Sequence, residues 1–247
     1  MLRYILSIAC VAMLTTSCVV SRAILYGDAS VDDYRAFEQE NIAKGDYTFR
    51  FAELTESERM LDTMRFEWMH FGRGEMAQMT IDEAIAPSVD NAAILIIHRD
   101  TILYERYFGE WSKCTQSQIF SVTKTITAML CGVALTEGHI RSVEDRVTEY
   151  LPELKQADPM FEELKIKHLL DMTAGLDFDE NYSFNPFSKM AKLYMGRNTM
   201  RIIERAKFSH KPGERYDYNS LTTAILGVVI ERATGMPYAE YLSSKIW

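Results

Sequence analysis

The sequence has few cysteines and few histidines, and this shortage excludes several classes of protein. Only four cysteines occur in 247 residues, and Cys10 and Cys18 belong to the first 18. The other two, Cys114 and Cys131, cannot make a disulfide scaffold, although a single bridge between them stays open. Cys131 falls in an apolar helical pattern and is expected to be a small buried side chain. The five histidines lack metal-ligand spacing, so we expect no metal and no other cofactor.

Positive charge is also scarce. The chain has 27 Lys and Arg against 35 Asp and Glu, a net charge of −8, with no basic cluster. A nucleic-acid-binding surface needs such a cluster, so nucleic acid is not expected as a partner. The P-loop and dinucleotide fingerprints are absent. The G-x-S-x-G elbow is absent too, which leaves a Ser-His-Asp triad on an α/β-hydrolase with little support.

The N-terminal apolar run, Tyr4–Leu14, is too short to span a bilayer comfortably. It follows Arg3 and leads through small residues to Cys18, which is the pattern of a secretory signal. The stretch "LTTSC" also looks like a bacterial lipoprotein signal, in which the cysteine is lipidated after cleavage, although Leu14 lies one place further from Cys18 than usual. We therefore expect export to the periplasm or cell envelope with a lipid anchor at Cys18. The alternative is an ordinary signal peptide cut nearby.

The rest of the chain divides into two regions by pattern. Residues 19–85 contain the polar, acidic stretch "DASVDDYRAFEQENIAKGDY". We expect them to be an N-terminal extension and approach segment. This segment would be either a tether or a loosely packed approach to the domain. Residues 86–247 are expected to form the domain. It opens with "AAILIIHRDTILYERYFGEW", which predicts a β-hairpin turning at Arg99–Asp100. The first run of that hairpin is almost wholly apolar, so we expect it to be buried on both faces.

Helical patterns follow the hairpin. Apolar residues spaced i, i+3, i+4, i+7 predict a helix that ends near Gly138. Further helices are expected after Ser142 up to Pro152, over about Ile166 to Met172 and around Met200–Lys207, and residues 177–188 should form a loop. A last buried helix should stop at Gly235. The stripes expected to be buried are Ile126, Met129, Leu130 and Val133 in the first helix, and Leu221, Ala224, Ile225, Val228 and Val229 in the last.

Ser121 and Lys124, in "FSVTKTITAML", are one helical turn apart and therefore share a face. A serine at the positive end of a helix dipole, with a partly desolvated lysine beside it to accept its proton, is the arrangement of S-x-x-K acyl-enzymes. The tetrapeptide is common by chance. Taken alone, a serine N-cap with an exposed lysine explains it better.

The wider context changes that interpretation. In order along the chain, "FSVTKTITAMLCGVALTEGHI", "VTEYLPEL", "IKHLLDMTAGLDFDENY" and "KPGERYDYNSLTTAILGVVIERATGMPYAEYLSSKIW" resemble the serine β-lactamase-related family. This family groups class C β-lactamases, DD-peptidases, esterases and aminohexanoate-oligomer hydrolases. The resemblance implies an α/β (α+β) fold of the β-lactamase/transpeptidase type, with a helical region and an antiparallel sheet. The implied activity is hydrolysis of a small ester, amide or peptide through an acyl-enzyme.

The resemblance also implies roles for individual residues. Ser121 would be the nucleophile, and Lys124 and Tyr218 would share proton transfer, with the primary base left open between them. Ser220, where class C β-lactamases have Asn, would orient the leaving group or bond Lys124. This Ser variant favours ester or amide hydrolysis over β-lactamase activity.

Other implied positions are less central. The Ser121 backbone N–H would be an oxyanion donor. Asp179 and Tyr182 are candidate substrate contacts, although a plain surface loop is the commoner explanation. Tyr216 aligns with a core aromatic of the family.

One family motif has no counterpart here. Relatives carry Lys-Thr-Gly or His-x-Gly on a strand near the C-terminus, and nothing after Ser220 matches it. We therefore expect a fragment or a truncated reading frame whose sheet lacks its C-terminal strands and exposes an edge. Two functions stay open at this point: a serine hydrolase that is active in a longer parent chain, or a non-catalytic module that binds cell-wall peptides or a partner.

Overall fold

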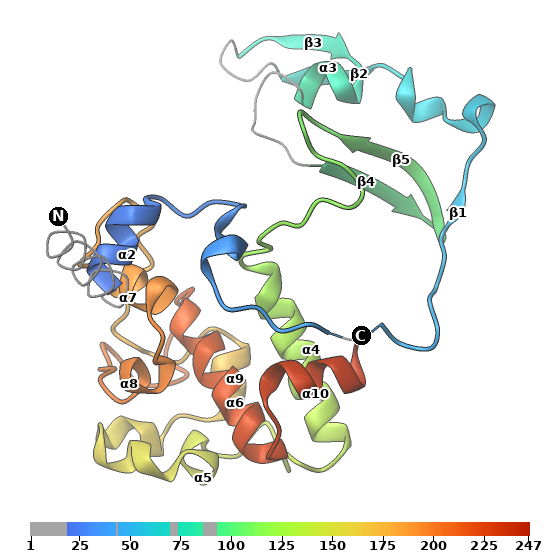
Figure 1. Cartoon of the computed structure of the whole chain (residues 1–247). Helices are drawn as coiled ribbons and strands as arrows, with labels where there is room; N and C mark the ends of the chain where they lie inside the picture. Colours follow the sequence, from blue (N-terminus) through green and yellow to red (C-terminus); the bar gives the residue numbers. More distant parts are fainter. Residues whose placement is uncertain (1–18, 43, 70–73, 86–92) are drawn as a thin grey trace, which may run out of the picture. The chain divides into compact units, whose positions relative to one another are not determined.

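The computed structural model describes residues 19–42, 44–69, 74–85 and 93–247. The expected signal segment, with Cys18, lies outside these residues. The described residues form two compact units, one that contains residues 19–42, Lys44 and 117–247, and one within residues 45–116. We call them the helical unit and the strand unit and describe each by itself (Figure 1).

The strand unit contains two small sheets. Strands β1 (Ala52–Glu53), β5 (Thr101–Tyr107) and β4 (Ala93–His98) form one sheet in the order β1-β5-β4, with β1 parallel and β4 antiparallel to β5. Strands β2 (Phe66–Met69) and β3 (Met76–Met79) form an antiparallel pair. Helix α3 (Ile81–Ile85) follows β3, and two 3-10 turns, Glu56–Glu58 and Met60–Asp62, precede β2.

The predicted hairpin is confirmed, but the predicted burial of its first strand is wrong. Arg99 and Asp100 connect β4 to β5 with φ of 48° and 59°, the left-handed values that a tight two-residue hairpin turn requires. Strand β4 ends the strand order at an edge, and its Leu95 and Ile97 are 51% and 38% exposed. The apolar composition predicts cover on both faces, whereas none of the six residues of β4 is fully buried. Tyr104 of β5 is the well-buried residue of this hairpin.

The helical unit is built around two long helices, α4 (Val122–Thr136) and α9 (Ser220–Thr234), which pack against each other. Shorter helices surround them: α5 (Val147–Tyr150), α6 (Ile166–Leu170), α7 (Lys189–Met195), α8 (Thr199–Ile203) and α10 (Tyr238–Lys245), with 3-10 turns at Pro152–Gln156 and Pro159–Glu162. The apolar side chains from these elements form one core that includes Leu130, Phe161, Ile166, Ile203 and Ile225. Residues 177–188 form the predicted loop.

Helix α4 buries a face slightly different from the predicted one. Its buried residues are Thr127, Leu130, Cys131 and Ala134, whereas Met129 is 56% exposed. The small side chains lie inward because α9 and α10 pack closely here, and the Thr127 hydroxyl is satisfied by the Tyr238 hydroxyl at 2.8 Å. Cys131 is fully buried as predicted, and burial raises the pKa of its thiol to about 11. Cys131 and the exposed Cys114 are both free thiols.

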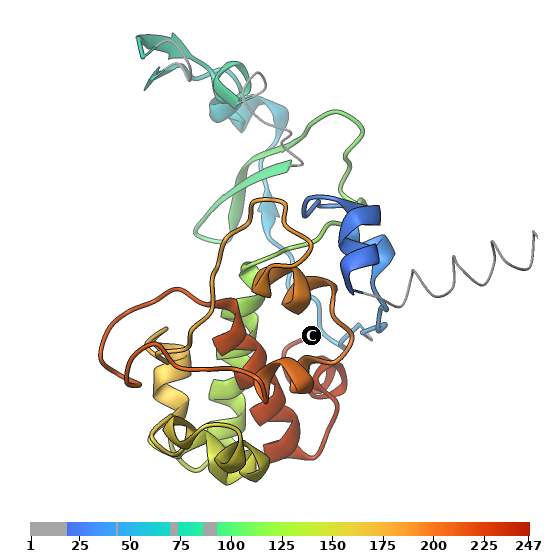
Figure 2. The ribbon, with the colours of Figure 1, turned by 90° about the vertical axis from the view of Figure 1, so that its left-hand side faces the viewer.

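The start of the described chain packs in part against the helical unit. Helix α2 (Val19–Tyr26) lies against α7 in both views of the ribbon (Figure 2). The 3-10 turn Asp33–Ala36 follows it, and both Arg22 and Asp33 are buried. Tyr216, expected in the core, is 67% exposed. Within the described part of the chain, no helix has the length and apolar character needed to cross a membrane.

Candidate active site

Ser121 stands at the N-terminal end of α4, directly after a residue with unusual backbone geometry. Phe120 has φ of 43°, a left-handed value that costs energy for a side chain of this size. The Ser121 side chain makes no capping hydrogen bond to its own helix. The interpretation as an ordinary N-cap therefore does not describe this serine, and its hydroxyl is available to other partners.

Two side chains share the Ser121 hydroxyl oxygen. The Tyr218 hydroxyl donates to Ser121 Oγ over 2.6 Å, and Lys124 Nζ donates to the same oxygen over 3.0 Å. Lys124 Nζ also donates to Ser220 Oγ at 3.0 Å and lies 4.7 Å from the centre of the Tyr218 ring. The four residues named from sequence are thus brought together, although α4 and the start of α9 are almost a hundred residues apart.

The segment that carries Tyr218 is held in place by a side-chain cap and by a backbone hydrogen bond to a distant turn. Asn219 is buried and caps α9, accepting the Leu221 N–H at 2.9 Å. The Asp217 N–H donates to the Met172 carbonyl at 2.8 Å, which ties the segment to the turn after α6. In that turn, Gly175 has φ of 77°, and a Cβ there would lie 2.3 Å from the His210 carbonyl oxygen. The glycine in "TAGL" therefore permits a close backbone approach.

Glu180 is the residue that sequence reasoning missed. Its Oε2 accepts the Ser220 N–H at 2.8 Å, and its Oε1 accepts a short hydrogen bond from the Ser220 hydroxyl. Tyr182 donates its hydroxyl to the same Oε1 at 2.6 Å. A carboxylate at the N-terminal end of a 15-residue helix is favoured by the helix dipole. The acidic stretch "DFDENY" was the available signal, but it did not tell which carboxylate faces the helix.

The two other loop candidates have different surroundings. Asp179 accepts the Asn181 N–H at 3.1 Å, a contact within its own turn, and the structure does not bring it to Ser121. Tyr182 is linked to the cluster through Glu180. Burial, together with the Glu180 carboxylate, raises the pKa of Tyr182 to about 12, so this tyrosine stays protonated.

Tyr218 has the opposite electrostatic environment. Partial burial raises its pKa, but the hydrogen bond with Ser121 and the positive charge of Lys124 outweigh burial and bring the pKa below the usual value for tyrosine. The Glu180 charge acts against this lowering. Tyr218 is therefore the tyrosine of this cluster that loses its proton more readily.

Ser121, Lys124 and Ser220 lie in the wall of an open cavity of about 460 Å³. We call it the main cavity. It is bounded by α4, α7 and α9 and also by Phe37 from the N-terminal segment. No group of His, Cys, Asp and Glu that could hold a metal ion occurs among the described residues. A nucleophile with two adjacent proton-transfer groups beside a cavity can support acyl transfer.

The comparisons with known proteins define the class. The family model described as "Beta-lactamase" matches residues 79–247, which is more than half of the chain. The chain therefore belongs to the β-lactamase family, and the resemblance drawn from its motifs is confirmed. The fold is the β-lactamase/transpeptidase fold.

Among curated relatives, "Protein flp" of Staphylococcus aureus (strain COL) is 26% identical over 166 residues, covering 64% of this chain and 32% of that protein. The "6-aminohexanoate-dimer hydrolase" of Paenarthrobacter ureafaciens is 26% identical over 166 residues, covering 63% of this chain and 41% of that protein. A solved structure, "Putative 6-aminohexanoate-dimer hydrolase from Bacillus anthracis", superposes with a TM-score of 0.64 at 23% identity over 81% of this chain and 52% of that one. The chain thus spans about a third to a half of these relatives.

Proposed function

We propose that this chain is a serine hydrolase of the β-lactamase family that forms an acyl-enzyme at Ser121 and cleaves an ester or amide. The observation that carries the proposal is the sharing of Ser121 Oγ between the Tyr218 hydroxyl and Lys124 Nζ, at 2.6 and 3.0 Å. Both partners are within the distance required for proton transfer from the nucleophile. The family match and the curated hydrolase relative support the same class of reaction.

The proposed reaction has two halves. In the first, Ser121 Oγ bonds to the carbonyl carbon while its proton passes to Tyr218 or Lys124, and the bond from that carbon to the leaving group breaks. Tyr218 returns a proton to the departing alkoxide or amine. In the second half, water attacks the acyl-enzyme carbonyl, gives up a proton to the same groups, and Ser121 leaves with a proton. The Ser121 backbone N–H is proposed as a donor to the oxyanion.

Ser220 and Glu180 support the proton-transfer groups in this proposal. Ser220 Oγ accepts from Lys124 and donates to Glu180, so its single proton is already committed. This arrangement holds Lys124 beside Ser121. Tyr182 in the wall of the main cavity is a proposed substrate contact. The substrate class favoured by Ser220 is an ester or linear amide, in keeping with the printed name of the Paenarthrobacter relative.

Labelling with a fluorophosphonate tests the proposal directly. We expect one equivalent of label on the chain and none on Ser121→Ala, with Ser117→Ala as the matched serine control that still labels. Short-chain p-nitrophenyl esters should be hydrolysed faster than nitrocefin. Absence of Ser121-dependent label in the folded protein, and in a version extended to the length of its relatives, would overturn the hydrolase and favour a binding module.

We propose separately that the protein is exported and lipid-anchored through Cys18, an expectation based on sequence alone. Bacteria grown with an alkyne-tagged palmitate should yield labelled protein from the native sequence and from Cys10→Ser. Label should be lost from Cys18→Ser. Equal labelling of the two variants, or none of the native chain, would contradict the anchor.

A further inference from the structure

The N-terminal segment, residues 19–42, is fastened to the helical unit by buried polar groups. Arg22 is 5% exposed, and its Nη1 donates to the Met195 carbonyl of α7 at 2.8 Å. Asp33 is 6% exposed and accepts the Tyr194 hydroxyl of α7 at 2.9 Å. Buried polar groups that are paired in this way become costly when a partner is removed. Two buried side chains of the segment are therefore anchored to α7.

The same segment reaches the surroundings of the nucleophile. The Gln118 N–H, three residues before Ser121, donates to the Val31 carbonyl at 2.8 Å. The ring of Phe37 packs edge-to-face on Tyr194 with centroids 5.2 Å apart, and Phe37 lines the main cavity. Residues that precede the family match, which begins at residue 79, thus contribute to the walls around the candidate site.

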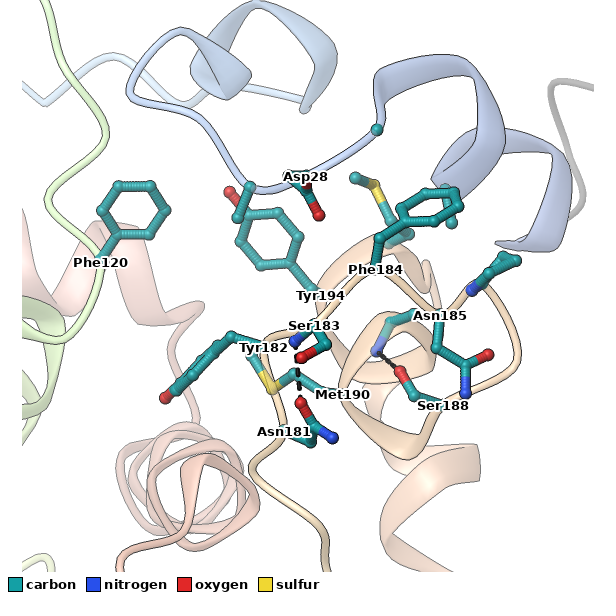
Figure 3. A pocket seen from close by; sticks show the side chains of 16 residues that line it. Asp28, Phe120, Asn181, Tyr182, Ser183, Phe184, Asn185, Ser188, Met190 and Tyr194 are labelled. Carbon is teal, nitrogen blue, oxygen red and sulfur yellow. Dashed lines mark hydrogen bonds between the residues drawn. The ribbon is translucent and has the colours of Figure 1, made fainter. Parts of the chain in front are cut away.

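A second, smaller cavity of about 100 Å³ lies next to the main one, and the segment forms one side of it (Figure 3). Residues 27–29, just after α2, face the loop 181–186 and helix α7 across this space. The two cavities have four lining residues in common, so they are neighbours separated by these side chains: Phe120, Tyr182, Met190 and Tyr194. One of the four, Phe120, directly precedes the nucleophile.

The walls of the small cavity are suited to an uncharged apolar group. The rings of Phe120, Phe184 and Tyr194 stand around the space in Figure 3, and no lysine or arginine lines it. The one carboxylate in the wall, Asp28, would repel an anion, and an anion here would lose hydration without gaining a cationic partner. Apolar surface removed from water is the favourable contribution that such a cavity offers.

The position of the small cavity indicates which part of a substrate would enter it. Tyr218, the proposed proton donor to the leaving group, lines neither cavity, whereas Phe120, the residue before Ser121, lines both. After the leaving group departs, the acyl group is the part that stays bonded to Ser121. We infer that the small cavity binds an apolar acyl group, with residues 27–29 as one wall, so that the N-terminal segment sets acyl selectivity. The assignment to an acyl group rests on the acylation of Ser121 proposed above.

A substitution in this wall tests the inference. Ala29 is exposed to solvent while lining the cavity, so Ala29→Trp can fill the space without disturbing the core. Leu25→Trp is the matched control, because Leu25 is 65% exposed in the same segment and lines neither cavity. With p-nitrophenyl acetate, butyrate and hexanoate, kcat/KM of the native protein should rise by up to about fourfold per buried methylene. Ala29→Trp should abolish that rise, and Leu25→Trp should keep it.

A binding experiment separates failure of the cavity from failure of the reaction. In a Ser121→Ala background, NMR titration should show that hexanamide binds more tightly than hexanoate, and that Ala29→Trp weakens hexanamide binding at least tenfold. Chain-length dependence or hexanamide binding that survives Ala29→Trp would overturn the inference. If no ester is turned over while hexanamide binding remains sensitive to Ala29→Trp, acylation at Ser121 and the acyl assignment fail together, but the apolar site stands.

Discussion

The two compact units bury their apolar side chains to different extents. In the helical unit, Leu130, Phe161 and Ile225 are fully shielded from solvent and belong to one continuous core. In the described residues of the strand unit, the buried apolar side chains are Ile81 and Tyr104. Small sheets of two or three strands have little area to cover and keep open edges, so much of their apolar surface stays in water.

All of the candidate chemistry lies in the well-buried unit. The contacts of Ser121 with Lys124 and Tyr218 depend on α4 and on the segment that leads into α9, and the inner faces of these two helices share that core. The Ser121 hydroxyl and the Lys124 side-chain nitrogen keep a separation of about 3 Å when the backbone that carries them is fixed in position. A close-packed core provides this restraint. The comparison therefore predicts that activity and stability are both most sensitive in the helical unit.

The largest expected effect concerns Lys124. Lys124→Met removes one of the two proton-transfer partners of Ser121, and we expect ester turnover to fall by about a thousandfold, within the usual range for acid–base groups. Lys113→Met is the control in the strand unit, since Lys113 is 68% exposed and forms only long ion pairs. Steady-state hydrolysis of p-nitrophenyl acetate measures both. Equal losses in the two variants would break the link between activity and the helical unit.

The next effect is on stability. Leu130→Ala deletes a fully buried side chain of α4, and large-to-small changes of this kind cost about 2–5 kcal/mol. Leu95→Ala makes the same change in β4, where the side chain is 51% exposed, and should cost about 0.5 kcal/mol or less. Urea unfolding followed by circular dichroism gives both free energies. Similar costs at the two positions would show that the strand unit has a core comparable to that of the helical unit.

The sequence was informative where pattern and position coincide. Helices α4 and α9, the Arg99–Asp100 turn and the stop at Gly235 follow from local rules of spacing and backbone conformation. The Ser121, Lys124, Tyr218 and Ser220 group could be predicted because the family motif already records which distant residues meet. The burial of β4 could not be predicted in this way, because it depends on what packs against the two faces of the sheet and not on the strand itself.

The N-terminal segment and Glu180 could not be predicted for a related reason. The acidic composition of residues 28–33 predicts a solvent-exposed stretch. Asp33 is nevertheless buried, and the Tyr194 hydroxyl of α7, far along the chain, donates a hydrogen bond to its carboxylate. Glu180 is one of three carboxylates within four consecutive residues of the loop 177–188, and only the position of α9 selects it. Tertiary partners decide both cases, and single-residue preferences carry no information about those partners.

Glu180→Gln should reduce activity by an intermediate amount and shows what the Glu180 carboxylate contributes to the site. An amide must turn its NH2 group toward one of the donors from Ser220 or Tyr182, which removes a hydrogen bond to a charged group worth about 1.5 kcal/mol. If that hydrogen-bond energy is lost in the transition state, kcat should fall about tenfold. Loss of the negative charge also makes the Tyr218 phenolate more favourable, so the pKa of Tyr218 should fall further.

Asp179→Asn is the matched control for that pKa, because it removes the same charge one residue away from a carboxylate bonded within its own turn. Titration of 13C-labelled tyrosine by NMR, with Tyr218→Phe to assign the signal, measures the shift. A Tyr218 pKa that is unchanged in Glu180→Gln, or lowered equally in Asp179→Asn, would mean that Glu180 has only a structural role in the loop.

The last prediction concerns the reactivity of one thiol in each unit and involves no change in activity. Cys114 of the strand unit is exposed, whereas Cys131 of α4 is fully buried with a thiol pKa raised to about 11. Because the thiolate is the reactive form, Cys131 should stay unmodified by a maleimide at pH 7 while Cys114 reacts within minutes. Mass spectrometry of tryptic peptides from native and urea-unfolded protein reads both sites. Rapid modification of Cys131 in the native protein would show that α4 separates readily from the core. A helix that separates in this way could not hold Ser121 and Lys124 at a fixed distance.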